Sequence, residues 1–292
     1  MSEPVIEVRG LRKSYGDFEA VRGIDFEVRR GEVFGLLGPN GAGKTTTVEI
    51  LEGYRSRTDG HVRVLGLDPG GRPRALRARV GIVLQSTGLY RHIKVREAIA
   101  HFAAMYPHAR DVAEVIALTG LGGKEDALVR TLSGGQLRRL DLALALVGDP
   151  ELIFLDEPTT GFDPAARRNA WETIRSLGQL GKTVLLTTHY LDEAQALANR
   201  VAIIKDGRIL VEGAPQELGA GGGAAPYRIA YRNGDGALTE RETADPTTLL
   251  HELTGAALAR GARLEGLTVT RPTLEDVYLE LTAGDDGHGE HG

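Results

Sequence analysis

The 292-residue sequence predicts an α/β fold in which helices cover both faces of a parallel central sheet. Several short runs are apolar at nearly every position, which is typical of parallel strands buried on both faces. Amphipathic stripes with helical spacing separate these runs, as expected for β-α-β connections. A glycine-rich segment that begins at Gly219 predicts that a second, smaller domain follows.

The N-terminal segment predicts an antiparallel sheet. Residues 23–32 read GIDFEVRRGE, in which apolar Ile24, Phe26 and Val28 alternate with charged residues. A period of two residues is the pattern of a strand with one buried face. We therefore expect an antiparallel β-subdomain before the parallel sheet.

Three apolar runs predict strands of the parallel sheet, namely VFGLLG from Val33, LIFL from Leu152 and VLL from Val184. Two stripes of mostly apolar residues, which recur every three or four positions, predict helices. These stripes consist of Thr47, Ile50, Leu51 and Tyr54 in the first helix and of Trp171, Ile174 and Leu177 in the second.

A helical insertion of about residues 89–140 interrupts this alternation, because no strand pattern is found between Leu89 and Leu132. Two amphipathic stripes in this segment predict helices instead. The stripes are Val95, Ala98, Ile99, Phe102 and Tyr106, followed by Val112, Val115 and Ile116.

The predicted first domain covers residues 1–218, and the composition of residues 219–226 predicts a flexible linker. Residues 227–283 form a predicted α+β accessory domain, with strands at YRIAYR and LEGLTV around a helix near residues 247–260. A last helix in PTLEDVYLELT begins at a Thr273 cap with Asp276 in its first turn. Residues 284–292 predict a disordered tail.

The charge and composition exclude several classes of protein. A net charge of -5 provides no basic surface for nucleic acid, so no nucleic-acid partner is expected. The absence of cysteine excludes disulfides, thiolate metal sites and a cysteine nucleophile. The start MSEPVIEVRG lacks the apolar core of a signal peptide, and no apolar run approaches the roughly 18 residues of a membrane-spanning helix. We expect a cytoplasmic chain that reaches a membrane only through a partner.

A phosphate-binding loop is predicted at residues 38–45, which read GPNGAGKT between an apolar strand and a helix. Its glycines let backbone N–H groups face phosphate oxygens, and the helix N-terminus adds the positive end of its dipole. Lys44 would reach the β- and γ-phosphates, and the Thr45 hydroxyl would bind Mg²⁺. The predicted ATP-binding residues here are Gly38, Pro39, Asn40, Gly41, Ala42, Gly43, Lys44, Thr45 and Thr46.

Two carboxylates and two other polar residues follow predicted strands of the same sheet. Asp156 ends LIFLD and would bind Mg²⁺, while the adjacent Glu157 would polarise the attacking water. His189 ends another apolar strand, at the edge where parallel sheets bind ligands, and could reach the γ-phosphate. Gln85 follows the short run VGIVL, and by itself a glutamine there is weak evidence of function.

Together with LSGGQ at residues 132–136, these segments resemble the nucleotide-binding subunit of ABC transporters over about residues 5–218. LSGGQ is that family's signature motif, and it lies in the family's order between Gln85 and the strand that ends at Asp156. The resemblance implies a P-loop NTPase core of the RecA-like type with an antiparallel β-subdomain and a helical insertion. It also implies an ATPase that couples ATP hydrolysis to transmembrane transport.

The resemblance further implies roles for individual residues. Tyr15, in LRKSYG, would stack on adenine, and Gln85 would contact Mg²⁺ or the attacking water. His189 would be the switch histidine, and Asp163, in TTGFDP, would lie in the loop that crosses a dimer interface. The family commonly has leucine where this chain has Phe162, a departure that leaves the neighbouring carboxylate in place.

The signature loop predicts a second anion site, since Ser133, Gly134, Gly135 and Gln136 open a helix. One chain has only one P-loop to hold a triphosphate. In the family's architecture two protomers pack head to tail, so each signature loop covers the nucleotide on its partner's P-loop. We therefore expect a homodimer, or a dimer with a paralogous ABC subunit, that closes on two ATP molecules and opens after hydrolysis.

Three longer segments resemble the daunorubicin-resistance type of ATPase, which works with a separate permease that exports drugs, lipids or polysaccharides. The segments are EILEGYRSRTDG, LSGGQLRRLDLALAL and RPTLEDVYLELT. This resemblance implies a drug- or antibiotic-type exporter subunit bound through its permease to the cytoplasmic face of the membrane. The substrate, the direction of transport and the role of residues 227–283 stay open.

A soluble ABC ATPase acting on ribosomes or DNA is the alternative function. Ribosome-associated relatives usually carry two cassettes joined by a charged linker, and DNA-repair relatives have long coiled-coil insertions. This chain has neither feature. A P-loop kinase or GTPase would not explain the signature loop, and no guanine-binding motif is recognisable.

Overall fold

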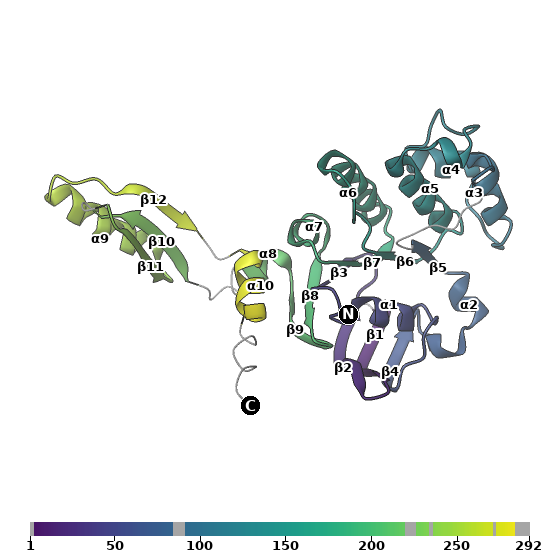
Figure 1. The fold of residues 1–292 in the computed structure, drawn as a ribbon, viewed down its shortest axis with the longest axis horizontal. Helices are drawn as coiled ribbons and strands as arrows, with labels where there is room; N and C mark the ends of the chain where they lie inside the picture. The colour runs from purple at the N-terminus through teal and green to yellow at the C-terminus, as the bar shows by residue number, and fades with distance from the viewer. Residues whose placement is uncertain (1–2, 84–90, 220–225, 234–235, 271–272, 284–292) are drawn as a thin grey trace. The chain divides into compact units, whose positions relative to one another are not determined.

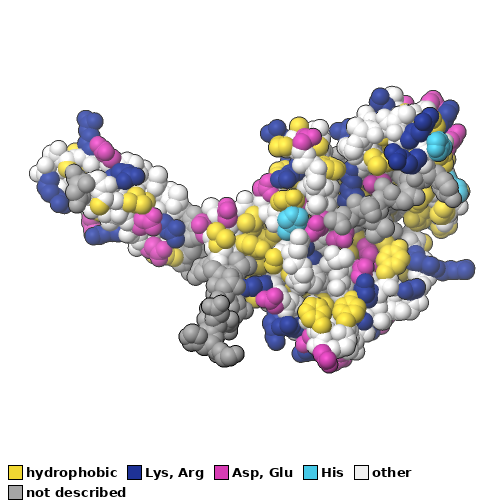
Figure 2. Space-filling view, in the orientation of Figure 1, with side chains coloured by type: hydrophobic (Ala, Val, Ile, Leu, Met, Phe, Trp, Pro, Cys, Tyr) yellow, Lys and Arg dark blue, Asp and Glu magenta, His cyan; other side chains and the backbone are white. Residues whose placement is uncertain are grey.

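The computed structural model describes residues 3–83, 91–219, 226–233, 236–270 and 273–283 (Figure 1). The chain forms two compact units, Met1–Glu212 and Gly213–Gly292. On the face drawn in Figure 2, the described Lys and Arg side chains lie among Asp and Glu side chains rather than in one basic stripe. None of the helices in the described segments combines the length and apolar character needed to cross a membrane.

The predicted antiparallel β-subdomain is confirmed. Strands β1 (Ile6–Tyr15), β2 (Phe18–Val28) and β4 (Asp59–Val64) form a sheet in the order β2-β1-β4, and both pairings are antiparallel. Ile24, Phe26 and Val28 are all buried, as the period of two residues predicts.

The central sheet has the order β5-β6-β7-β3-β8-β9. Its strands are β3 (Val33–Leu37), β5 (Val80–Val83), β6 (Leu152–Asp156), β7 (Thr183–Thr188), β8 (Arg200–Lys205) and β9 (Arg208–Gly213). The first five strands in this order are parallel. The two-residue connection to β9 has positive φ at Asp206 and Gly207, the geometry of a type I′ hairpin turn. The α/β fold class is therefore confirmed.

Helices cover both faces of this sheet (Figure 1). On one face, Phe34 and Phe154 pack with α1 (Lys44–Leu51) and the antiparallel sheet. On the other face, Ile153 and Leu186 pack with α5 (Gly134–Leu146), α6 (Pro164–Gln179) and α7 (Leu191–Leu197). The phosphate-loop helix and the signature-loop helix therefore lie on opposite faces.

The predicted first helical stripe extends too far, because Tyr54 lies beyond α1 and is 60% exposed. The helix ends where Gly53 takes a φ of 79°. The Gly53 N–H donates to Ile50 O and the Tyr54 N–H to Glu49 O, which is a Schellman ending that turns the chain away from the helix. Short elements η1 (Pro69–Gly71) and α2 (Arg74–Arg77) follow β4.

The helical insertion is present, and the described residues 91–132 contain no strand. Helices α3 (Val95–Ala103) and α4 (Val112–Leu118) pack with η2 (Val129–Thr131) and α5 around a separate apolar cluster. Tyr106 lies beyond the end of α3, so its predicted place in the helix is wrong, but its ring still packs against this cluster.

The second unit contains a three-stranded antiparallel sheet in the order β11-β10-β12. Its elements are α8 (Pro215–Gly219), β10 (Tyr227–Arg232), β11 (Leu238–Thr243), α9 (Pro246–Ala259), β12 (Glu265–Thr270) and α10 (Leu274–Ala283). Thr273 and Asp276 exchange hydrogen bonds at the start of α10, as predicted, whereas β11 was not predicted.

The unit boundary precedes the predicted linker because α8 packs against α10 and so belongs to the second unit. Most of the linker, residues 220–225, and the predicted tail, residues 284–292, lie outside the described residues.

Candidate functional site

The P-loop, residues 38–45, connects β3 to α1 and runs close to neighbouring backbone. Gly43 has a φ of 102°, and a Cβ atom there would lie 2.6 Å from Ala20 O. A Cβ atom at Gly38 would lie 2.1 Å from Ile204 O. Glycine is therefore required at both positions by contacts within this chain.

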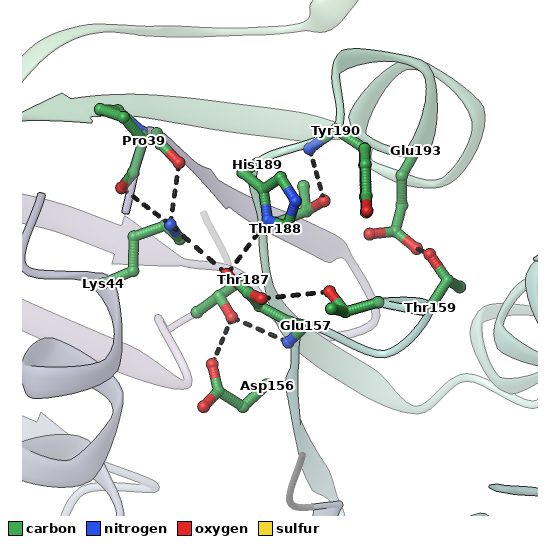
Figure 3. Close-up of polar contacts among 12 residues, drawn as sticks. Pro39, Lys44, Asp156, Glu157, Thr159, Thr187, Thr188, His189, Tyr190 and Glu193 are labelled. Atoms are coloured by element: carbon green, nitrogen blue, oxygen red, sulfur yellow. Dashed lines mark hydrogen bonds and ion pairs between the residues drawn. The ribbon is translucent and has the colours of Figure 1, made fainter. Parts of the chain in front are cut away.

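The Lys44 side chain is buried inside the loop, with 4% of its surface exposed. Its Nζ donates to Gly38 O at 2.8 Å and to Pro39 O at 3.0 Å, and it lies 3.7 Å from Glu157 Oε1 (Figure 3). Burial lowers the pKa of Lys44, while the Glu157 and Asp156 carboxylates oppose that shift. A cation at the start of α1, among loop backbone groups, suits the binding of a phosphate chain.

Glu157 and His189 meet beside Lys44, although they come from the ends of different strands. Glu157 Oε1 lies 3.2 Å from His189 Nδ1, and Glu157 Oε2 accepts from Thr160 Oγ1 at 3.1 Å (Figure 3). Glu157 has a φ of 45°, a left-handed conformation that non-glycine residues rarely adopt. Such backbone strain is common at functional sites, where the surrounding structure holds it in place.

Thr187, which was not among the predicted site residues, joins Asp156 to Glu157. Its Oγ1 donates to Asp156 Oδ1 at 2.5 Å and accepts from the Glu157 N–H at 3.0 Å. Asp156 is directly opposite Thr187 in the β6–β7 pairing. The register of two parallel strands creates this contact, so no local sequence pattern indicates it.

A cavity of about 390 Å³ brings together many of the predicted ATP-binding residues. Of the predicted residues, its lining includes Tyr15, Asn40, Gly41, Gly43, Lys44, Thr45, Thr46 and Glu157. Phe18 and Arg55 also line it and were not predicted. The Arg55 guanidinium lies 5.3 Å and Lys13 Nζ 4.9 Å from the centre of the Tyr15 ring, which is 40% exposed.

No described group of three or more His, Asp or Glu side chains could hold a metal by itself. Mg²⁺ is usually held by one or two protein ligands together with substrate phosphates and water, so Thr45 and Asp156 still fit that ion. Gln85, the other predicted Mg²⁺ ligand, lies outside the described residues.

The signature loop opens α5 with a reciprocal pair of hydrogen bonds. The Ser133 N–H donates to Gln136 Oε1 at 3.0 Å, and the Gln136 N–H donates to Ser133 Oγ at 3.3 Å. Apart from the chain neighbours and the backbone of α5 itself, no described heavy atom lies within 4 Å of a Cβ atom built at Gly134 or Gly135. Neither of these glycines has a positive φ.

A second cavity, of about 610 Å³, is lined by residues 133–136 and by Gly161, Phe162 and Asp163. Asp163 Oδ1 caps α6 by accepting from the N–H groups of Ala165 and Ala166. Among the described residues, this cavity shares no lining residue with the P-loop cavity. The predicted site residues thus form two separate groups within one chain.

Known proteins resemble the chain along almost its whole length. The sequence profile of a family described as ABC transporter matches residues 21–160. Nod factor export ATP-binding protein I of Paraburkholderia xenovorans is 42% identical, with 97% of this chain and 98% of that protein covered. Daunorubicin resistance ATP-binding protein DrrA3 of Streptomyces coeruleorubidus is 38% identical, with 98% of both covered.

Among solved structures, an ATP-binding subunit of an ABC transporter matches with a TM-score of 0.68. The match covers 95% of this chain and 99% of that subunit, and the two sequences are 22% identical. This match shows a likeness of fold that extends over both units.

Proposed function

The chain belongs to the ABC transporter family, whose ATPases hydrolyse ATP to power transport, and we propose that it is the ATP-hydrolysing subunit of an exporter. In this proposal two cassettes close on two ATP molecules and drive a separate membrane permease. The observation that carries the proposal is the convergence of Lys44, Glu157 and His189 beside the P-loop.

Each of these residues beside the P-loop has a distinct chemical role in the proposal. Lys44 and the loop N–H groups hold the β- and γ-phosphates and offset their negative charge. Glu157 accepts a proton from the attacking water, and His189, 3.2 Å away, holds that carboxylate and contacts the γ-phosphate. The lowered pKa of Lys44 follows from burial that a bound polyphosphate would compensate.

Thr45 and Asp156 are the described residues that would hold Mg²⁺, and Gln85 is the further predicted ligand. When bound, Mg²⁺ would neutralise phosphate charge. Thr187 keeps the Asp156 carboxylate in one orientation. Tyr15, with Arg55 and Lys13 against its ring, would bind the adenine by stacking.

The signature loop supports a site that is shared between two cassettes. No contact or positive φ within the described chain requires glycine at positions 134 and 135, yet a phosphate approaching α5 would need that space. The loop's helix packs on the face of the sheet opposite the P-loop helix. A second chain in head-to-tail orientation would supply a phosphate to this loop, with Asp163 near the junction.

Cross-linking tests the shared site cleanly because the chain has no native cysteine. We would mix a Ser133→Cys chain with an Asn40→Cys chain, both carrying Glu157→Gln to prevent hydrolysis. ATP should produce a disulfide-linked dimer in the mixture, whereas either chain alone should give little cross-linking. Equal cross-linking with and without ATP, or none in the mixture, would contradict the shared site.

The exporter function rests on the relatives, one named for Nod factor export and one for daunorubicin resistance. A permease partner would hold the chain at the cytoplasmic face of the membrane. Inverted membrane vesicles containing the chain and the membrane protein encoded beside it should accumulate an exported compound when ATP is added. Daunorubicin and Nod factor are suitable probes, with the Glu157→Gln chain as the inactive control.

Failure of the chain to bind any membrane protein, together with ATP-dependent binding to ribosomes or DNA, would overturn the exporter proposal.

A further inference from the structure

Glu193, in the first turn of α7, is a fully buried carboxylate outside the set of residues assigned above. Glutamate is rarely buried to this extent unless several groups pair with it. Its Oε1 accepts from Thr159 Oγ1 at 2.7 Å and from Trp171 Nε1 at 3.2 Å. Its Oε2 is also buried and has no hydrogen-bond partner among the described residues.

The partners of Glu193 belong to segments that carry the proposed catalytic groups. Thr159 follows Glu157 by two residues, and Glu193 itself lies on α7, four residues after His189. Trp171 lies on α6, the helix that Asp163 caps. Figure 3 shows Glu193 and Thr159 facing each other near the Glu157 and His189 pair. One carboxylate therefore connects the segment after β6 with α6 and with α7, the helix that follows His189.

The chemistry of this contact favours a defined geometry. Burial raises the pKa of Glu193, and the hydrogen bonds from Thr159 and Trp171 and the nearby Arg167 charge oppose that rise only in part. Hydrogen bonds between buried groups are stronger than those in water, so the two bonds to Oε1 restrict the orientation of this carboxyl group. Thr159 is itself buried, so its hydroxyl cannot easily exchange this partner for water.

We propose that Glu193 is a positioning residue that holds the Glu157 segment against the His189 segment during ATP hydrolysis. This inference rests on the proposed function of Glu157 and His189. Thr187 links Asp156 and the Glu157 N–H within the sheet, and Glu193 adds a second link beyond the strand ends. Because small displacements at a reacting centre reduce rate strongly, loss of this link should lower turnover more than ATP binding.

The first test compares Thr159→Val with Thr159→Ser. Valine keeps the buried volume but removes the hydroxyl that donates to Glu193, and serine retains that hydroxyl. We expect Thr159→Val to lower kcat about tenfold with KM for ATP within about twofold of wild type. Thr159→Ser should recover most of the lost kcat.

The matched control is Thr183→Val, at the start of strand β7, whose other end precedes His189. Its buried hydroxyl accepts from the Gly31 N–H at 3.0 Å and lies outside the proposed site. This variant should lower thermal stability but leave kcat unchanged. A similar loss of kcat in Thr183→Val would show that the Thr159 effect comes from lower stability alone. That result would overturn the inference.

Trp171 provides a readout that a simple stability effect would not change, because it is the chain's one tryptophan. Its indole N–H donates to Glu193, so its emission should change when ATP binds beside Glu157 and His189. That change should persist in Thr159→Ser and be lost in Thr159→Val. An equal ATP-induced change in both variants would contradict the inference.

Glu193→Gln keeps the side-chain shape and serves if Thr159→Val does not fold. The amide oxygen can still accept from Thr159 and Trp171, but an –NH₂ group replaces the buried Oε2, so kcat should fall several-fold with KM little changed. An active wild type with normal kcat in both Thr159→Val and Glu193→Gln would overturn this inference alone. A wild type that fails to hydrolyse ATP would overturn the proposed function as well.

Discussion

The P-loop and the signature loop are both glycine-containing turns that open a helix, but their surroundings differ. At the P-loop, Lys44 is buried, and Gly38 and Gly43 approach backbone oxygens too closely for any side chain. At the signature loop, Ser133 and Gln136 bond to each other, and the space beside Gly134 and Gly135 is open in the described structure.

This difference teaches that the two sets of glycines serve different needs. Gly38 and Gly43 of the P-loop are required by the chain's own packing, whether or not a nucleotide is bound. The signature glycines leave room for something that approaches from outside. P-loop variants should therefore affect chemistry and stability, whereas signature-loop variants should affect ATP-driven association.

The largest expected effect is on the P-loop side, in Glu157→Gln. Removal of the proposed base should lower kcat on the order of 100-fold or more while ATP binding is retained. Phosphate release and equilibrium ATP binding measure the two quantities. Glu151→Gln is the control, because this half-exposed carboxylate pairs with Arg79 and Arg30 away from the loop. Unchanged hydrolysis in Glu157→Gln would refute its assignment as the base.

The next effect is on the signature side, in Ser133→Arg. A bulky cation should occupy the open space beside α5 and prevent closure, since Ser133 is exposed and the space beside Gly134 and Gly135 is open. ATP-dependent dimers should disappear in size-exclusion chromatography, while each chain still binds ATP. Normal ATP-driven dimerisation of this variant would contradict the proposed role of the signature loop in closure.

A pair of alanine variants compares the two loops directly. Gly43→Ala should lower the free energy of unfolding by about 1–3 kcal/mol, since φ is 102° and Ala20 O is 2.6 Å from the new Cβ. Gly135→Ala should be neutral or stabilising by up to about 1 kcal/mol, because it lies in a helix with open space around it. Urea unfolding measures both, and equal destabilisation would contradict the comparison.

The smallest effect concerns the pH dependence of stability near the P-loop. Burial, with the Asp156 and Glu49 charges, raises the pKa of Glu52 to about 8 from 4.5. Between these values the folded state binds more protons than the unfolded state, so this group's contribution to stability falls as pH rises.

Glu52→Gln should therefore raise the free energy of unfolding by about 1–2 kcal/mol at pH 8 and by much less at pH 5. Urea unfolding of the nucleotide-free protein at both pH values tests this. A stabilisation that is larger at pH 5 than at pH 8 would show that the pKa of Glu52 is not raised in the folded state.

Several features were predictable because they depend on short segments. The buried strands from Val33, Leu152 and Val184 follow from runs without polar residues, and the cap of α10 follows from Thr273 and Asp276. The end of α1 was missed because the Schellman turn at Gly53 overrides the apolar spacing that continues to Tyr54. Strand β11 was missed because LTERET is mostly polar.

The sequence alone determined the α/β fold class, the P-loop and the ATPase family, because each depends on residue order within contiguous motifs. Only the tertiary structure decided that Lys44, Glu157 and His189 meet, that Thr187 bonds to Asp156, and that Glu193 joins Thr159 to Trp171. These contacts depend on the register of parallel strands and on the helices packed against them. Residues between 22 and 113 positions apart become neighbours there for reasons that no local pattern contains.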